Sequence, residues 1–79
     1  MPTLRGVITV VQEGRFRLAY ADGRSKLFVL SSSAPVEPQD LPLLQRAQAR
    51  VSVRYEEAED LLAAIAHDLR MEENEGKSR

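Results

Sequence analysis

Four cationic side chains lie at alternate positions of two neighbouring segments in the N-terminal half: Arg15, Arg17, Arg24 and Lys26. In an extended chain, side chains two residues apart point to the same face of a sheet. Cations on one face can neutralise phosphates, and an aromatic ring among them can stack on a base. Phe28 lies two residues after Lys26 and can supply that ring. These residue types point to single-stranded nucleic-acid binding.

The two segments are joined by Asp22-Gly23, a pair that favours a type I′ hairpin turn because both central residues take positive φ. A two-residue turn predicts that Ala21 opposes Arg24 and that Arg17 opposes Phe28. One face then carries the core residues Phe16, Leu18, Tyr20, Leu27 and Val29. The other face is predicted to carry the candidate site residues Arg15, Arg17, Arg24, Lys26, Phe28 and Leu30.

Three interpretations of this second face are open. The first is binding of RNA or DNA single strands to the cations, with bases stacked on Phe28 or on arginine planes. The second is protein–protein contact or homodimerisation, since Phe28, Leu30 and Arg17 are typical interface anchors. The third is structural: arginine stems cover Phe28, with a cation–π gain of roughly 0.5–1 kcal/mol.

The remaining elements follow from residue patterns. β-branched residues predict a strand over residues 4–12, and period-2 alternation predicts strands over residues 15–21 and 50–55. Residues 24–31 are expected to form the return strand of the hairpin. Residues 61–71 also alternate and are expected to form a strand, although they are good helical material. Asp40 can cap a short helix over residues 40–48, in which Leu41 and Leu44 share a face that can plug a barrel. This order predicts an all-β, five-stranded OB-type barrel with a short helix between strands 3 and 4.

A series of motifs in the N-terminal half supports this fold. Gly6 opens the β-branched strand, residues 13–18 read Glu-Gly-Arg-Phe-Arg-Leu, and residues 27–30 read Leu-Phe-Val-Leu after the Asp-Gly turn. This layout resembles a cold-shock domain, a nucleic-acid-binding relative of the OB fold. The resemblance implies a binding face on this hairpin. The two exposed aromatic positions of the family's first motif fall on Arg15 and Arg17, and the exposed aromatic of its second motif is kept as Phe28. The family's first-strand tryptophan falls on Val10, which joins the candidate site.

Length and composition limit the alternatives. The chain has 79 residues, 43% of them hydrophobic and 29% charged, which is typical of one small globular domain. There is no cysteine, so neither disulfides nor thiolate zinc sites stabilise the fold. The longest apolar run, residues 61–66, is far shorter than the roughly 20 residues of a membrane span, and the start lacks a signal-peptide pattern. We therefore expect a cytoplasmic protein with no membrane contact.

The side chains needed for catalysis or metal binding do not occur in the required patterns. His67 is the only histidine and is expected to be a partly buried or edge side chain. Residues 31–33 are serines without the glycine context of a nucleophile elbow. The acidic residues Glu56, Glu57, Glu59 and Asp60 lack the spacing of a calcium loop. We expect no enzyme, no catalytic residue, no metal and no cofactor.

Charge is segregated along the chain. Residues 1–55 carry eight Lys or Arg against four acids, a net of +4, and residues 56–79 carry a net of −5. We expect residues 1–71 to form the barrel domain and residues 72–79 a disordered acidic tail. The tail either solubilises the protein or folds back onto the basic face and competes with a ligand. The partner is expected to be single-stranded nucleic acid or a protein, and the chain a monomer or weak homodimer.

Overall fold

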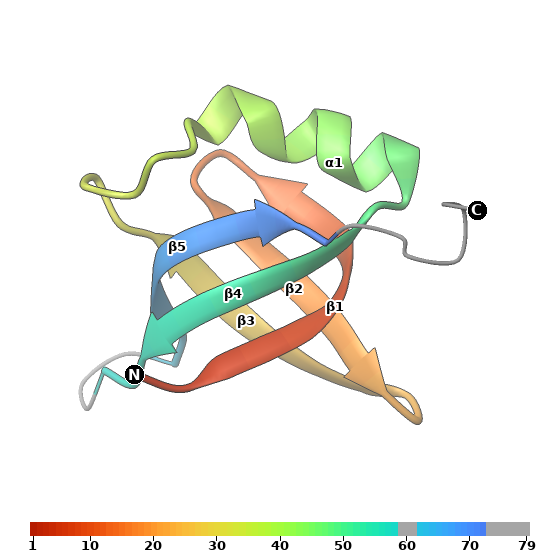
Figure 1. The fold of residues 1–79 in the computed structure, drawn as a ribbon, viewed down its shortest axis with the longest axis horizontal. Coiled ribbons are helices and arrows are strands. Elements are labelled where there is room, and N and C mark those ends of the chain that lie inside the picture. The colour runs from red at the N-terminus through yellow and green to blue at the C-terminus, as the bar shows by residue number, and fades with distance from the viewer. Residues whose placement is uncertain (59–61, 73–79) are drawn as a thin grey trace.

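The chain forms five strands and one short helical segment in the computed structural model, which describes residues 1–58 and 62–72 (Figure 1). The strands are β1 (Thr3–Gln12), β2 (Arg15–Ala21), β3 (Arg24–Leu30), β4 (Arg50–Glu56) and β5 (Ala64–Met71). A 3-10 turn, η1 (Pro38–Asp40), leads into α1 (Leu41–Ala47) between β3 and β4. Each predicted strand is present, and the ambiguous last one is a strand. The predictions for residues 59–61 and 73–79 lie outside the described residues.

The strands close into a barrel in the order β1-β2-β3-β5-β4, with β4 paired back to β1. All neighbouring strands are antiparallel except β3 and β5, which pair in parallel through residues 28–30 and 64–66. This confirms the all-β, five-stranded OB-type barrel with a short helix between strands 3 and 4. Closure pairs the two edges that an open five-stranded sheet exposes.

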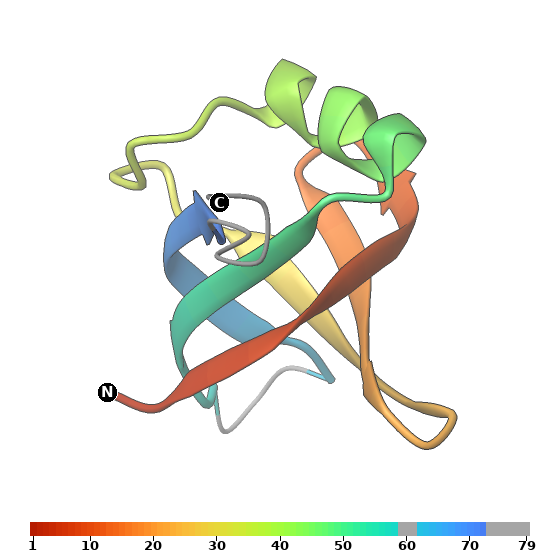
Figure 2. The ribbon, with the colours of Figure 1, turned by 45° about the vertical axis from the view of Figure 1, so that its right-hand side comes forward.

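Apolar side chains from all five strands and α1 fill the barrel: Ile8, Phe16, Leu18, Phe28, Leu41, Val51, Val53, Ala64, Ala66 and Leu69. The rings of Phe16 and Phe28 stack with their centroids 5.2 Å apart, and Tyr55 packs edge-on to Phe28 at 5.3 Å. The helix α1 lies across one end of the barrel (Figure 2). Its Leu41 is fully buried and Leu44 packs against the core, so the predicted plug is confirmed.

Two polar contacts hold the helical segment in place. The carboxylate of Asp40 accepts a hydrogen bond from the backbone N–H of Glu37 at 3.2 Å. This contact is part of a capping box at the start of η1, where Glu37 is the N-cap residue. Asp40 is the N-cap residue of α1, but its side chain makes no capping hydrogen bond there, so the predicted side-chain cap is wrong. The side-chain amide of Gln45 donates to the carbonyl oxygen of Thr9 at 2.8 Å. Thr9 lies at a β-bulge in β1, between Ile8 and Val10, where regular pairing with β2 is interrupted.

The turn between β2 and β3 has the predicted geometry. Asp22 and Gly23 both have positive φ, 36° and 80°, and Ala21 opposes Arg24. Immediately beyond this pair, the register shifts by one residue at a β-bulge in which Tyr20 is the extra residue. The bulge lies on β2, and it changes the phase of every pair farther from the turn.

Beyond the bulge, Phe16 opposes Phe28 and Arg17 opposes Leu27. The predicted pairing of Arg17 with Phe28 is wrong, because a regular period-2 pattern does not reveal an extra residue in one strand. The two faces of β3 are exchanged as a result. Phe28 points into the barrel, whereas Leu27 and Val29, which were predicted in the core, are half-buried on the outside.

Gly6 is a point of close approach between β1 and β2. A Cβ atom at this position overlaps the carbonyl oxygen of Ala19. We expect Gly6→Ala to lower the free energy of unfolding by about 1–3 kcal/mol, because the two strands must separate to admit the methyl group. Urea unfolding followed by circular dichroism measures this loss.

Gly14 provides the matched control, since a Cβ there meets nothing within 4 Å and its φ is not positive. Gly14→Ala is expected to change stability by less than about 0.5 kcal/mol. Equal losses in the two variants contradict the role of strand packing at Gly6.

Candidate nucleic-acid interface

The outward side chains of the first three strands form one surface, which we call the β1–β3 face: Val7, Val10, Gln12, Arg15, Arg17, Ala19, Ser25, Leu27 and Val29. Arg15 and Arg17 are exposed on its central strand, β2. Val10 lies opposite Arg17 on β1 and is 50% exposed. Three of the predicted site residues therefore lie together on one face of the barrel.

Phe28 and Leu30 do not lie on this face, which corrects the prediction from sequence. Phe28 is 0% exposed, in the core between Phe16 and Tyr55. Leu30 is half-buried and packs against the same core. The ring expected to stack on bases is therefore unavailable to a ligand. The alternative in which arginine stems shield an exposed Phe28 is also wrong, because the core covers the ring.

Lys26 lies on the same side of β3 as Phe28, opposite Leu18, and so is separated from the arginines of β2. Its ammonium group is 2.9 Å from the Oε2 atom of Glu57 and 5.5 Å from the centroid of the Tyr55 ring. The hydrogen bond to Glu57 raises the pKa of Lys26, against the opposing effect of burial, and the negative charge of Glu57 adds to the rise. The predicted place of Lys26 on one basic face with Arg15 and Arg17 is wrong.

Arg24 is exposed at the end of the β2–β3 hairpin. The tip of this hairpin projects from the barrel at the end away from α1 (Figures 1 and 2). Arg24 is thus accessible but lies beyond the central part of the β1–β3 face.

Sequence reasoning missed an apolar strip beside the two arginines. Leu27 and Val29 are half-buried on the outside of β3, and Ile65 on β5 lies next to Val29 in the parallel pairing. Tyr20, also predicted in the core, is half-buried at the bulge. Residues 27–30 are all apolar, so either phase of alternation gives β3 an apolar inner face. The bulge at Tyr20 determines which side chains of β3 point inward, and no sequence motif predicts this bulge.

The strands β1, β2 and β3 contain five cationic residues and no acidic residue: Arg5, Arg15, Arg17, Arg24 and Lys26. The nearest acids in sequence, Glu13 and Asp22, lie in the connecting turns. Within residues 1–58 and 62–72, no ion pair involves an arginine of β2 or Arg24. Of these cations, Arg15 and Arg17 lie on the β1–β3 face, which carries no acidic residue, so this face is positively charged and has an electrostatic preference for anions.

The histidine considered as a catalytic candidate, His67, contacts one acidic side chain. His67 on β5 is half-buried, as predicted, and its Nε2 atom lies 2.8 Å from Glu56. In the described part of the chain, no three His, Cys, Asp or Glu residues are close enough to hold a metal ion. The helix in this same part is too short to cross a membrane.

The Lys26–Glu57 pair gives a direct test of this geometry. Glu57→Gln is expected to lower the pKa of Lys26 towards its ordinary value of 10.5, because the anionic hydrogen-bond partner is removed. The stabilisation from the pair is present below that unfolded-state value and is lost as pH rises through the raised pKa of the folded protein. A side-chain NMR titration of Lys26 measures the shift. Glu56→Gln, which removes a neighbouring acid bound to His67, is the control and should leave Lys26 unchanged.

No protein-family model matches this chain, and no curated protein or solved structure matches it either. The binding properties of the outer surface are therefore inferred from its own side chains. Those side chains are exposed arginines on β2 beside a half-buried apolar strip on β3 and β5.

Proposed function

We propose that this chain is a non-catalytic module that binds single-stranded nucleic acid through the β1–β3 face. The observation that carries the proposal is the exposed pair Arg15 and Arg17 on strands that contain no acid. Each phosphate contact made by such a cation releases a counterion from the nucleic acid, which favours binding at low salt. The outer face of strands 2 and 3 is also where OB-type barrels commonly bind oligonucleotides.

Binding of this kind is expected to depend on charge more than on base identity. The face has no aromatic side chain among its described residues, since Phe16 and Phe28 are both in the core. Bases can instead stack on the planar guanidinium groups of Arg15 and Arg17. Val10 on β1 and the apolar strip on β3 and β5 flank these arginines and offer further contact area. The proposal is thus a weak, strongly salt-dependent interaction with little sequence preference.

The resemblance to cold-shock domains supports the same ligand class. The motifs that carry it, Gly6 at the start of β1 and the hairpin of β2 and β3, belong to the three strands of the proposed face. The aromatic positions of the family fall on Arg15 and Arg17, so cations take the place of stacking rings. This substitution favours phosphate contacts over base contacts.

Arg17→Ala is expected to weaken oligonucleotide binding because it removes one cation that neutralises a phosphate. The dependence of log K on log salt concentration should become shallower by about 0.7 for each phosphate released in this way, and by about 1.4 in Arg15→Ala/Arg17→Ala. Fluorescence anisotropy with a labelled mixed-sequence oligonucleotide, at several salt concentrations, measures both quantities. Arg46→Ala removes the same charge from α1 and is the control. Equal weakening in Arg17→Ala and Arg46→Ala, or unchanged binding by the double variant, contradicts the proposed face.

The apolar strip favours a second candidate function, which is homodimerisation through the same surface. Leu27, Val29 and Ile65 are half-buried in this strip, and Val10, which is 50% exposed, lies on the other side of Arg17 on β1. If this strip is an interface, the mass from light scattering rises with protein concentration, and Val10→Glu prevents the rise because it places a charge in the interface. A monomer at every concentration rules out the homodimer.

A further inference from the structure

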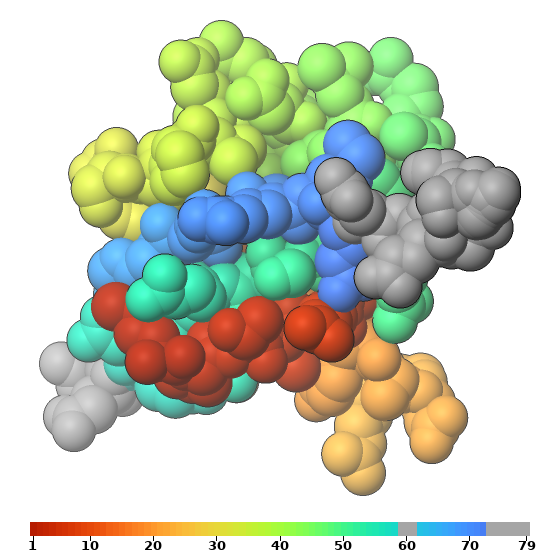
Figure 3. All heavy atoms as spheres, in the orientation of Figure 1, coloured from red at the N-terminus to blue at the C-terminus, as the bar shows by residue number. Residues whose placement is uncertain are grey.

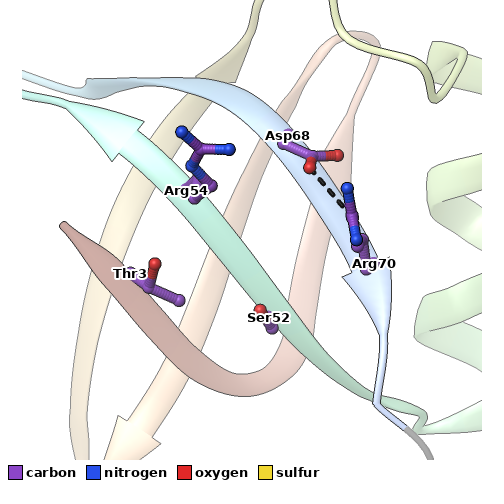
Figure 4. A pocket seen from close by; sticks show the side chains of 5 residues that line it. All are labelled: Thr3, Ser52, Arg54, Asp68 and Arg70. Carbon is purple, nitrogen blue, oxygen red and sulfur yellow. Dashed lines mark hydrogen bonds and ion pairs between the residues drawn. The ribbon is translucent and has the colours of Figure 1, made fainter. Parts of the chain in front are cut away.

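A second charged surface lies on the outside of the barrel, on the three neighbouring strands β1, β4 and β5. Figure 3 shows these three strands side by side on one face of the molecule (red, teal and blue). A hollow of about 180 Å³ lies between their side chains. Figure 4 shows the residues that line it: Thr3, Ser52, Arg54, Asp68 and Arg70.

The strand register explains why this hollow forms. In one row, Ser52 on β4 lies directly opposite Arg70 on β5. In the adjoining row, Arg54 lies between Thr3 on β1 and Asp68 on β5. The short hydroxyl side chains are thus surrounded by long charged ones, since neighbouring strands are only about 4.8 Å apart.

Two charged groups in the hollow are incompletely paired within the described part of the chain. The Oδ2 atom of Asp68 accepts a hydrogen bond from Nε of Arg70 at 3.0 Å, but its Oδ1 atom is buried without a hydrogen-bond partner. Arg54 opposes Asp68 in the register and yet forms no ion pair with a described acid. A buried acceptor without a donor is unfavourable, so a ligand that brings a donor to Oδ1 gains affinity.

The hollow therefore favours a group with two features side by side: an anion for Arg54 and a hydrogen-bond donor for Asp68. A bare anion satisfies the first feature only and is repelled by the carboxylate of Asp68. The volume of about 180 Å³ is below the roughly 300–1,000 Å³ of pockets that enclose whole ligands, so one unit of a longer chain fits better. Ribose phosphate combines the two features, because the 2′-hydroxyl is a donor beside the phosphate, and DNA lacks it.

We infer that this hollow seats one ribonucleotide unit of a bound strand, with its phosphate at Arg54 and its 2′-hydroxyl donating to Asp68. The inference rests on the proposed function and adds a preference for RNA over DNA. The hollow and the β1–β3 face share β1: Val7 pairs with Ala19 on β2 and with Arg50 on β4. A strand bound at β2 therefore crosses only β1 to reach β4. Oδ1 is buried, so a side chain of the hollow must shift before a donor reaches it, and the neighbouring Arg70 side chain is 77% exposed.

Three oligonucleotides of identical sequence test the inference on the unmodified protein: RNA, DNA containing deoxyuridine, and 2′-O-methyl RNA. The methylated strand keeps an RNA-like backbone but cannot donate from the 2′ position. We expect RNA to bind about threefold to tenfold more tightly than either of the others, the range for one net hydrogen bond. Equal binding of all three overturns the inference and leaves the proposed function intact. No binding of any strand overturns both, and equal binding of RNA and 2′-O-methyl RNA overturns the role of the donor.

Variants of Asp68 assign the preference to this residue. Asp68→Ala should abolish the preference for RNA without weakening DNA binding, because it removes the acceptor and a repulsive charge. Asp68→Asn keeps an acceptor oxygen and should keep part of the preference. Glu56→Gln removes a neighbouring acid that does not line the hollow and should keep all of it. A full preference in Asp68→Ala overturns the inference.

The amide signals of the unmodified protein give a readout that does not depend on the folding of any variant. The signals of Ser52, Asp68 and Arg70 should shift with RNA and shift less with DNA at equal saturation. Equal shifts with the two strands overturn the assignment of the preference to this hollow.

Discussion

The stacked contact between Phe16 and Phe28 determines how the rest of the surface is arranged. Burial of each ring stabilises the fold by roughly 1.5–3 kcal/mol, so a register that exposes Phe28 is strongly disfavoured. With Phe28 inside, Leu27 and Val29 must point outward, and the bulge at Tyr20 is the local adjustment that makes this phase compatible with the Asp-Gly turn. The positions of Lys26 and Leu30 follow from the same constraint.

Local patterns predicted most of the fold. The Asp22-Gly23 turn, the alternating strand of residues 15–21 and the plug formed by Leu41 are all determined within a few residues of chain, and each is present in the structure. The face of β3 was not predictable, because residues 27–30 are apolar in both phases and the deciding bulge lies on the other strand. The bulge therefore moved Phe28 and Lys26 out of the candidate site and left Arg15, Arg17 and Val10 in it.

Contacts between residues distant in sequence could not be predicted from residue patterns either, because they depend on which strands pair. Lys26 meets Glu57 only because β3 pairs with β5, which brings the loop after β4 beside the barrel rim. The hollow at Ser52 likewise depends on the mutual register of β1, β4 and β5. Exposed ion pairs of this kind contribute little to stability, about 0–1 kcal/mol each. Their larger effect is on which cations are engaged: Glu57 binds Lys26 and Glu72 binds both Arg5 and Arg50.

The parallel pairing of β3 and β5 is shorter than the β1–β4 pairing on the other side of the barrel. It consists of three residue pairs, extended by a hydrogen bond from the N–H of Ser31 to the carbonyl of Ala66, whereas the β1–β4 contact on the other side pairs five. The shortest ladder of a barrel is where local opening is easiest. If this ladder opens, the meander of β1, β2 and β3 and the β4–β5 hairpin stay joined through the longer β1–β4 pairing. Opening of the β3–β5 ladder would change the angle between these two parts of the barrel, and with it the curvature of the outer surface that a bound strand must follow.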